Sequence, residues 1–108
     1  MTFSEYQQKA SATAIYGAGN AVNYPILGLV GESGELANKY KKVLRDDDGV
    51  LTNEKRQAIA DELGDVLWYV AALARDLKVD LEEVAQKNLD KLYDRKARGV
   101  ISGSGDKR

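Results

Sequence analysis

Apolar residues recur every three or four positions through most of the chain, which is the spacing of amphipathic α-helices. No segment alternates between apolar and polar residues in the way that is typical of a half-buried β-strand. The pattern predicts four helices, at residues 3–15 and 25–44, from a cap at Thr52 to residue 77, and from a cap at Asp80 to residue 97. The predicted fold class is all-α, a four-helix-type bundle.

Residues with special capping or backbone properties mark the ends of these helices. Thr2 with Glu5 and Asp80 with Glu83 have the three-residue spacing of a capping box. Pro25 suits the first position of a helix, where its missing N–H does no harm. Three segments outside the helices are expected to be irregular: the glycine-containing residues 16–23, the hydrophilic turn 45–49 and the glycine-rich tail 99–108. The composition of the tail is typical of a disordered end.

Two residue counts restrict the chemistry most. The chain has no cysteine and no histidine. Their absence excludes thiolate zinc sites, disulfide scaffolds and nucleophiles that need an imidazole base. The 16 Lys and Arg residues against 17 Asp and Glu give a net charge of −1, so the overall charge favours neither a nucleic-acid polymer nor a membrane as partner. Acid–base and metal chemistry must therefore depend on carboxylates.

The length of 108 residues predicts one domain, residues 1–108. A core of this size leaves little depth for a closed pocket, which favours a cleft between the subunits of a homodimer or homotetramer. No apolar run approaches the roughly 18 residues of a membrane span, and the N-terminus lacks the apolar core of a signal peptide. The expected compartment is the cytoplasm.

Two pairs of acidic residues lie at the edges of apolar helix faces. Glu32 and Glu35 flank the second predicted helix, and Glu62 and Asp65 flank the third. Each pair is spaced by three residues, which brings its side chains together. If the two faces pack together, the four carboxylates can converge, and cations must then neutralise them. Oxygen ligands without histidine or cysteine select Mg²⁺ or Mn²⁺. The alternative is that all four are solvated surface acids.

Three residues accompany these acids on the same two helices. Lys39 lies on the flank of the second helix that carries the two glutamates, and Tyr69 lies between the two acids of the third. Tyr69 can contact a ligand or pack between the helices. Trp68 points away from the apolar face of its helix, which predicts burial against another subunit or, alternatively, stacking on a base.

The fourth predicted helix carries polar residues where its apolar face should be. Asn88 falls in the middle of that face, Arg95 lies close to its centre, and Lys91 lies on its flank. A polar group in an apolar face needs a partner. That partner is either a ligand or a neighbouring part of the protein, and the long Arg95 side chain can also reach past the face to water.

Two segments carry a family resemblance. Residues 31–36 read Gly-Glu-Ser-Gly-Glu-Leu, and residues 61–69 read Asp-Glu-Leu-Gly-Asp-Val-Leu-Trp-Tyr. Together they resemble the Glu-x-x-Glu and Glu-x-x-Asp helices of the MazG-like all-α nucleoside triphosphate pyrophosphohydrolases. The resemblance continues through residues 79–81, 88–95 and 98–106. Many members begin the first motif with two adjacent glutamates, whereas this chain has Gly31, a form similar to the dCTP pyrophosphatase branch.

The resemblance implies an enzyme that cleaves a nucleoside triphosphate between its α and β phosphates and so controls a nucleotide pool. It implies that Glu32, Glu35, Glu62 and Asp65 hold Mg²⁺, for which Mn²⁺ can substitute. Glu35 or, almost equally, Glu32 would accept the proton of the attacking water. The resemblance also implies that Asn88, Lys91 and Arg95 bind the substrate. Lys39, Trp68 and Tyr69 are expected to bind it too, because of their positions on the two helices that carry the acids.

Two other functions stay open at this point. The chain can be a non-catalytic helical interaction or regulatory module that keeps the motif as structure. It can also be a related carboxylate–metal hydrolase that acts on nucleoside diphosphates or monophosphates. The complete set of four carboxylates favours an enzyme, because an inactive relative has no chemical reason to keep it.

Overall fold

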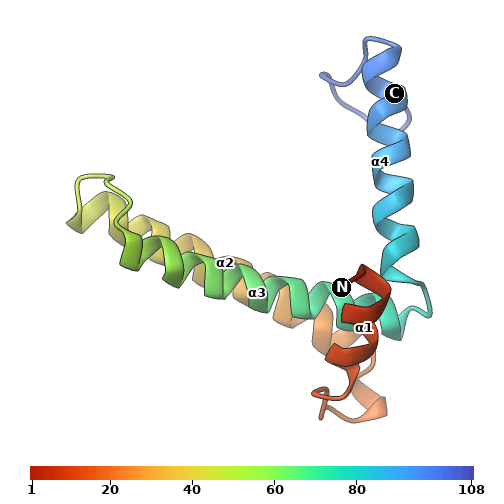
Figure 1. Ribbon diagram of the computed structural model, residues 1–108, viewed down its shortest axis with the longest axis horizontal. Helices are drawn as coiled ribbons and strands as arrows, with labels where there is room; N and C mark the ends of the chain where they lie inside the picture. The colour runs from red at the N-terminus through yellow and green to blue at the C-terminus, as the bar shows by residue number, and fades with distance from the viewer.

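The computed structural model describes residues 1–108 and contains helices and turns but no β-strand (Figure 1). The all-α prediction is therefore confirmed. The elements, in chain order, are α1 (Phe3–Ser11), the short 3₁₀ helix η1 (Ala18–Asn20), α2 (Asn23–Asp46), α3 (Asn53–Asp76) and α4 (Leu81–Ala97). No helix is long and apolar enough to cross a membrane.

Side-chain caps begin three of the four α-helices, as predicted. Thr2 and Glu5 form the reciprocal capping box of α1. The Thr52 hydroxyl accepts from the backbone N–H of Lys55 at the start of α3. Asp80 also caps α4, but its carboxylate accepts from the backbone N–H of Glu82. The capping box expected between Asp80 and Glu83 is therefore not formed.

The first two helices differ from the predicted boundaries. α1 ends at Ser11 instead of residue 15, because the Thr13 hydroxyl donates to the Ala10 carbonyl and the Arg75 guanidinium donates to the Ser11 carbonyl. α2 begins at Asn23, which places Pro25 at its third position. A proline is tolerated there because the N–H groups of a first helical turn have no partner within the helix.

The two longest helices form an antiparallel hairpin, and the others gather at one end of it. α2 and α3 lie side by side along their lengths, with α1 against α3 and the start of α4 (Figure 1). The core at this end consists of Ala71, Ala74 and Leu81, with Tyr6 and Val70 packed against it. Small residues allow α1 to approach α3 closely.

The single chain is not a closed four-helix bundle. After its first turns α4 leaves the hairpin and runs in another direction (Figure 1). The radius of gyration is 16.9 Å, against about 13 Å for a compact chain of this length. The accessible surface is 7,777 Å², whereas a compact monomer of this mass exposes about 6,000 Å². One chain alone does not close the predicted bundle, because α4 meets α1 and α3 only near its start and no helix of the same chain lies along the rest of it (Figure 1).

The glycine-rich tail is non-helical, as predicted, but it folds back on the end of α4. Arg95 of α4 donates to the Asp106 carbonyl at 2.8 Å, and Arg98 donates to the Arg108 carbonyl. Arg108 in turn donates to carbonyls of residues 100, 101 and 105. These bonds give the tail a folded form in place of the expected disordered end.

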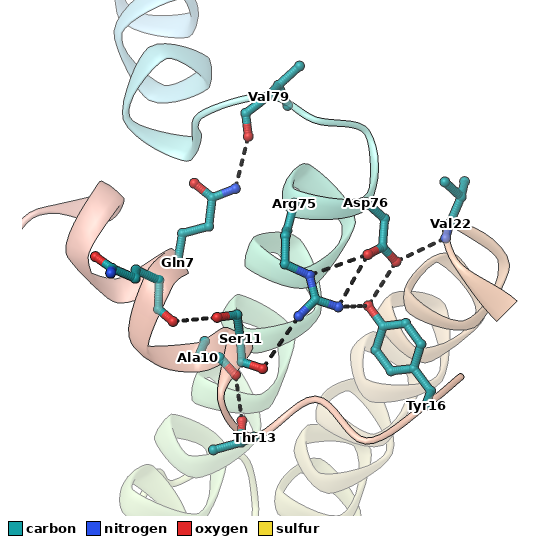
Figure 2. Close-up of polar contacts among 10 residues, drawn as sticks. Gln7, Ala10, Ser11, Thr13, Tyr16, Val22, Arg75, Asp76 and Val79 are labelled. Atoms are coloured by element: carbon teal, nitrogen blue, oxygen red, sulfur yellow. Dashed lines mark hydrogen bonds and ion pairs between the residues drawn. The ribbon is translucent and has the colours of Figure 1, made fainter. Parts of the chain in front are cut away.

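A buried carboxylate joins the segment between α1 and α2 to the end of α3. Asp76 accepts hydrogen bonds from the Tyr16 hydroxyl at 2.8 Å and from the Val22 N–H at 3.0 Å (Figure 2). Arg75 bonds to Asp76, Tyr16 and the Ser11 carbonyl. Val22 has a φ of 69°, which is strained for a β-branched residue. The Asp76 contacts hold this strained start of α2 in place.

Asp76 predicts a specific loss of stability in acid. Burial alone would raise the pKa of Asp76, but hydrogen bonds from Val22, Tyr16 and Arg75 outweigh it and hold the pKa below its ordinary value. Asp76→Asn is expected to lower the free energy of unfolding by about 1–3 kcal/mol near pH 7. A depressed folded pKa stabilises the protein above the unfolded pKa, and this contribution is lost as pH falls through the folded value.

Urea unfolding of both proteins between pH 7 and pH 2 measures this effect. The difference between wild type and Asp76→Asn should shrink once the pH falls below about 4, the ordinary range of an aspartate. A difference that stays constant over the whole pH range would contradict the assignment, because a purely steric effect of the amide does not titrate.

Candidate functional site

Three of the predicted carboxylates meet in the seam between α2 and α3. Glu32 belongs to α2, and Glu62 and Asp65 belong to α3. One carboxylate oxygen from each lies within 4.8 Å of the others. The antiparallel hairpin brings the two Glu-x-x-acid motifs opposite each other. The sequence prediction that acids from two helices converge is met by these three residues.

Glu62 is the centre of this group and its most buried member. Its side chain is 14% exposed, and its Oε1 atom pairs with Lys39 Nζ at 2.9 Å. Its Oε2 atom is buried and has no hydrogen-bond partner. The bond from Lys39, together with the contact with Glu32, lowers the pKa of Glu62. Contact with the Glu62 carboxyl group raises the pKa of Glu32, and burial and the charges of Asp65 and Glu35 raise it further.

These residues fit a divalent cation. Three carboxylate groups at this separation repel one another, and a buried oxygen without a partner costs free energy. A cation bound among them would remove both costs. All the available ligand atoms are carboxylate oxygens, which is the donor set that Mg²⁺ and Mn²⁺ prefer.

Glu35 lies one turn further along α2 and stands apart from the three converging acids. Its side chain is exposed, and it is not among the groups that can share one ion. Its charge still acts on Glu32 and Lys39. A carboxylate beside the group but outside it is free to accept a proton.

Aromatic side chains border the carboxylates on the side nearer to α1. Tyr69 lies edge to face with Trp68, with ring centroids 5.0 Å apart, and it lies 6.1 Å from the ring of Tyr24. Tyr24 stacks on Tyr16 at 4.6 Å. An open cavity of about 310 Å³ is lined by two of the acids and two of these rings: Glu32, Asp65, Trp68 and Tyr69.

Trp68, which is expected to meet another subunit or a base, is half-buried within its own chain. Its indole N–H donates to the Thr13 hydroxyl at 2.7 Å, and residues of α1 share a small cavity with it. The segment that follows α1 therefore covers part of the ring. The helical wheel of α3 could not reveal this, because it does not contain α1.

The three predicted binding residues of α4 are not brought to the carboxylates within one chain. Asn88 and Lys91 are exposed, and α4 runs away from the hairpin (Figure 1). Arg95 is only 7% exposed and donates to the Asp106 carbonyl of the tail.

Two residues near the site escaped the sequence analysis. Tyr24 and Gly28 precede Glu32 by eight and four residues, so all three share one face of α2. The Tyr69 ring lies directly where a Cβ atom of Gly28 would be. The four-residue spacing of Tyr24, Gly28 and Glu32 is the sequence signal that could have placed the first two beside the site.

Gly28→Ala is expected to displace the Tyr69 ring and destabilise the protein by about 1–3 kcal/mol, the usual cost of overpacking. Gly31→Ala is the matched control, because a Cβ at Gly31 meets no atom within 4 Å. Removing that helical glycine should stabilise the protein by up to about 1 kcal/mol. Thermal unfolding of the two variants measures the contrast, and equal effects would contradict the close contact with Tyr69.

Comparisons with known proteins agree on one family. The model of the MazG nucleotide pyrophosphohydrolase domain matches residues 23–100. The Gene 37 protein of Mycobacterium phage L5 is 59% identical over 109 residues, which cover 95% of this chain and 96% of the phage protein. The dCTP pyrophosphatase 1 of Bos taurus is 36% identical over 67 residues, or 60% of this chain and 40% of the bovine protein. No solved structure matches significantly.

The matched region contains α2, α3 and α4 and therefore every acid of the two motifs. It also contains the seam in which Glu32, Glu62 and Asp65 meet. The resemblance drawn from residues 31–36 and 61–69 is thus confirmed by a match over most of the chain. The chain belongs to the MazG nucleotide pyrophosphohydrolase domain family.

Proposed function

We propose that this protein is a Mg²⁺-dependent nucleoside triphosphate pyrophosphohydrolase that controls a nucleotide pool. It cleaves its substrate between the α and β phosphates to give a nucleoside monophosphate and pyrophosphate. The observation that carries the proposal is the convergence of Glu32, Glu62 and Asp65 around a buried Glu62 oxygen without a partner. The family membership supports a nucleotide pyrophosphohydrolase.

Each residue of the site has a chemical task in this proposal. Glu32, Glu62 and Asp65 would hold the cation, and Glu35 would complete the set from the next turn. Mg²⁺ bound there would neutralise the triphosphate and make water a better nucleophile. Glu35 accepts the proton of the attacking water, with Glu32 as the alternative base. The water oxygen bonds to the α phosphorus, and the bond to the α–β bridging oxygen breaks with its electron pair leaving on pyrophosphate.

The aromatic residues bind the other part of the substrate. Tyr69 and Trp68 line the same cavity as Glu32 and Asp65, and aromatic faces stack well on nucleobases. A nucleoside on these rings would place its phosphates at the acids.

A nucleotide screen tests this function. Tri-, di- and monophosphates of the common nucleosides are incubated with the protein and Mg²⁺, and pyrophosphate and orthophosphate are measured separately. Pyrophosphate from triphosphates alone is the expected result. Release of orthophosphate would indicate a different hydrolase, and no turnover of any nucleotide would favour a non-catalytic interaction module.

We also propose that the active protein is at least a homodimer. The chain exposes about 1,800 Å² more surface than a compact monomer of its mass. A cavity lined only by hydrophobic residues opens where α4 leaves the hairpin, with Leu29, Leu73 and Val84 among them. A second copy would cover this face and could bring its own Asn88, Lys91 and Arg95 to the carboxylates.

Val84→Asp is expected to weaken this assembly, because it places a charge on the apolar face of α4. Val84 is partly exposed in the single chain, so the monomer tolerates the change better than an interface does. Light scattering after size exclusion should show wild type at two or more times 11.9 kDa and the variant shifted towards the monomer. A fully active wild-type monomer would contradict the proposal.

A further inference from the structure

A second cavity in the α2–α3 seam has the opposite charge. Its volume is about 200 Å³, and three lysines and three small or apolar residues line it: Lys39, Lys42, Val43, Lys55, Ala58 and Ile59. No carboxylate lines it. Residues from both helices contribute, as they do to the cavity beside Glu32 and Asp65.

Two of the three lysines have no ionic partner. Lys39 pairs with Glu62, but Lys42 and Lys55 form no ion pair. The acid whose pKa responds to both of them, Asp46, is already bonded by the Arg45 guanidinium through both carboxylate oxygens. Unpaired positive charges over an apolar floor, with space between them, attract an anion.

The lysine cavity continues the line of the carboxylates along one face of the hairpin. On α2, Lys39 follows Glu35 by four residues, and Lys42 follows Glu35 by seven. On α3, Lys55 precedes Glu62 by seven residues, or about 10 Å of helix axis. These spacings keep all five side chains on one face. The Lys39–Glu62 ion pair lies where the acidic and basic parts of this face meet.

Three chemically different regions therefore follow one another along the seam. The rings of Trp68 and Tyr69 come first, the acids around Glu62 follow, and the lysines come last. A nucleoside triphosphate has the same order of parts, with an aromatic base, an α phosphate and a terminal pair of phosphates. The order of the three regions along the seam therefore matches the order of the parts of the substrate.

We propose that Lys42 and Lys55, with Lys39 at the boundary with the acids, form the subsite for the β and γ phosphates, which leave as pyrophosphate. This inference rests on the proposed function for its substrate, but the subsite itself binds any linear polyphosphate. Lysine suits this task because its flexible side chain carries a compact charge to a phosphate oxygen. The cation balances only part of the substrate's charge, and the lysines balance the rest.

Binding of inorganic tripolyphosphate and pyrophosphate tests the subsite without turnover of a nucleotide. The test variant is Lys42→Gln/Lys55→Gln, and the matched control is Lys41→Gln/Arg56→Gln. The control removes the same charge from the same two helices, but its residues line neither of the two cavities in the seam. Calorimetry with Mg²⁺ gives Kd, and thermal unfolding shows whether each variant is folded. The single variants replace the double one if it does not fold.

The test variant is expected to bind tripolyphosphate at least about tenfold more weakly, the scale of lost hydrogen bonds to charged groups. The control should change Kd by no more than about twofold, as exposed charges do. With a hydrolysed nucleotide, KM should rise and the inhibition constant of pyrophosphate should rise with it, while affinity for the monophosphate stays unchanged.

Equal Kd changes in the test and control variants would overturn the subsite, even if the wild type hydrolyses triphosphates. Failure of the proposed function alone would give a different result. If wild type hydrolyses no nucleotide but its binding of tripolyphosphate depends on Lys42 and Lys55, the subsite stands and the proposed function fails.

Discussion

Glu62→Gln is expected to reduce the rate of nucleoside triphosphate hydrolysis by at least about 100-fold, the scale of losing a metal ligand or catalytic carboxylate. Glu62 lies between Glu32 and Asp65, and its Oε2 atom is the buried oxygen without a partner. An amide keeps the shape of the side chain but removes its charge and one acceptor. Steady-state kinetics with saturating Mg²⁺ measure the loss.

The neighbouring Asp61→Asn is the control for this variant. Asp61 is exposed, accepts a hydrogen bond from Gln57 and is not one of the three converging acids. This variant should keep its activity. Glu62→Gln loses the ion pair with Lys39 as well as the repulsion from its neighbours, so only a small fall in thermal stability is expected, whereas Glu32→Gln, which removes a carboxylate whose pKa its neighbours raise, should be at least as stable as wild type. Unchanged activity with a large fall in stability would show that Glu62 is structural.

The same loss is expected for Glu32→Gln, Glu35→Gln and Asp65→Asn, and chelation of the metal should abolish activity until Mg²⁺ or Mn²⁺ is added back. Glu35 gives the most informative result. It lies outside the group that can share one ion, so its variant should lose less of its affinity for Mg²⁺ than Glu62→Gln does, although its turnover falls as far. Calorimetric titration with Mg²⁺ alone separates these two effects.

The features that the sequence predicted correctly are local ones. Helix periods and caps depend on neighbours three or four residues away, so the starts of α1, α3 and α4 were correct. The meeting of Glu32 with Glu62 and Asp65 needed one further assumption, that two apolar faces pack in an antiparallel hairpin. A short turn between two long helices makes that packing the default.

The features that the sequence missed depend on contacts between distant segments. The end of α1 at Ser11 depends on Arg75, which lies 64 residues away. The covering of Trp68 depends on Thr13. The direction of α4 depends on what covers its apolar face, and Asn88 and Lys91 gave no sign that their helix leaves the hairpin. Periodicity shows which face is apolar but not which partner it meets.

The order of charges along the hairpin also could not be predicted from the sequence. The sequence placed Lys39 on the flank of Glu32 and Glu35, but the pairing with Glu62 needs the register between α2 and α3. Only that register shows that Lys42 and Lys55 line one cavity. Once it is known, the seam has a direction, and the direction predicts which phosphorus is attacked.

Hydrolysis in ¹⁸O-labelled water is expected to place the label in the nucleoside monophosphate and none in pyrophosphate. In the proposed arrangement Trp68 and Tyr69 bind the nucleoside and Lys42 and Lys55 bind the terminal phosphates, which would place the acids between them at the α phosphorus. The chain has no cysteine or histidine nucleophile, and the proposed function assigns the carboxylates to the cation and the proton, so direct attack by water is expected.

Mass spectrometry of both products measures the position of the label, and unlabelled products incubated with the protein control for later exchange. Label in pyrophosphate would mean attack at the β phosphorus, with the substrate shifted by one phosphate towards the rings. Labelled orthophosphate would mean attack at the γ phosphorus. No pyrophosphate would then leave, which would contradict the role proposed for the lysines. Label confined to the monophosphate would show attack at the α phosphorus, as expected for a substrate with its base at Tyr69 and its leaving phosphates at Lys42 and Lys55.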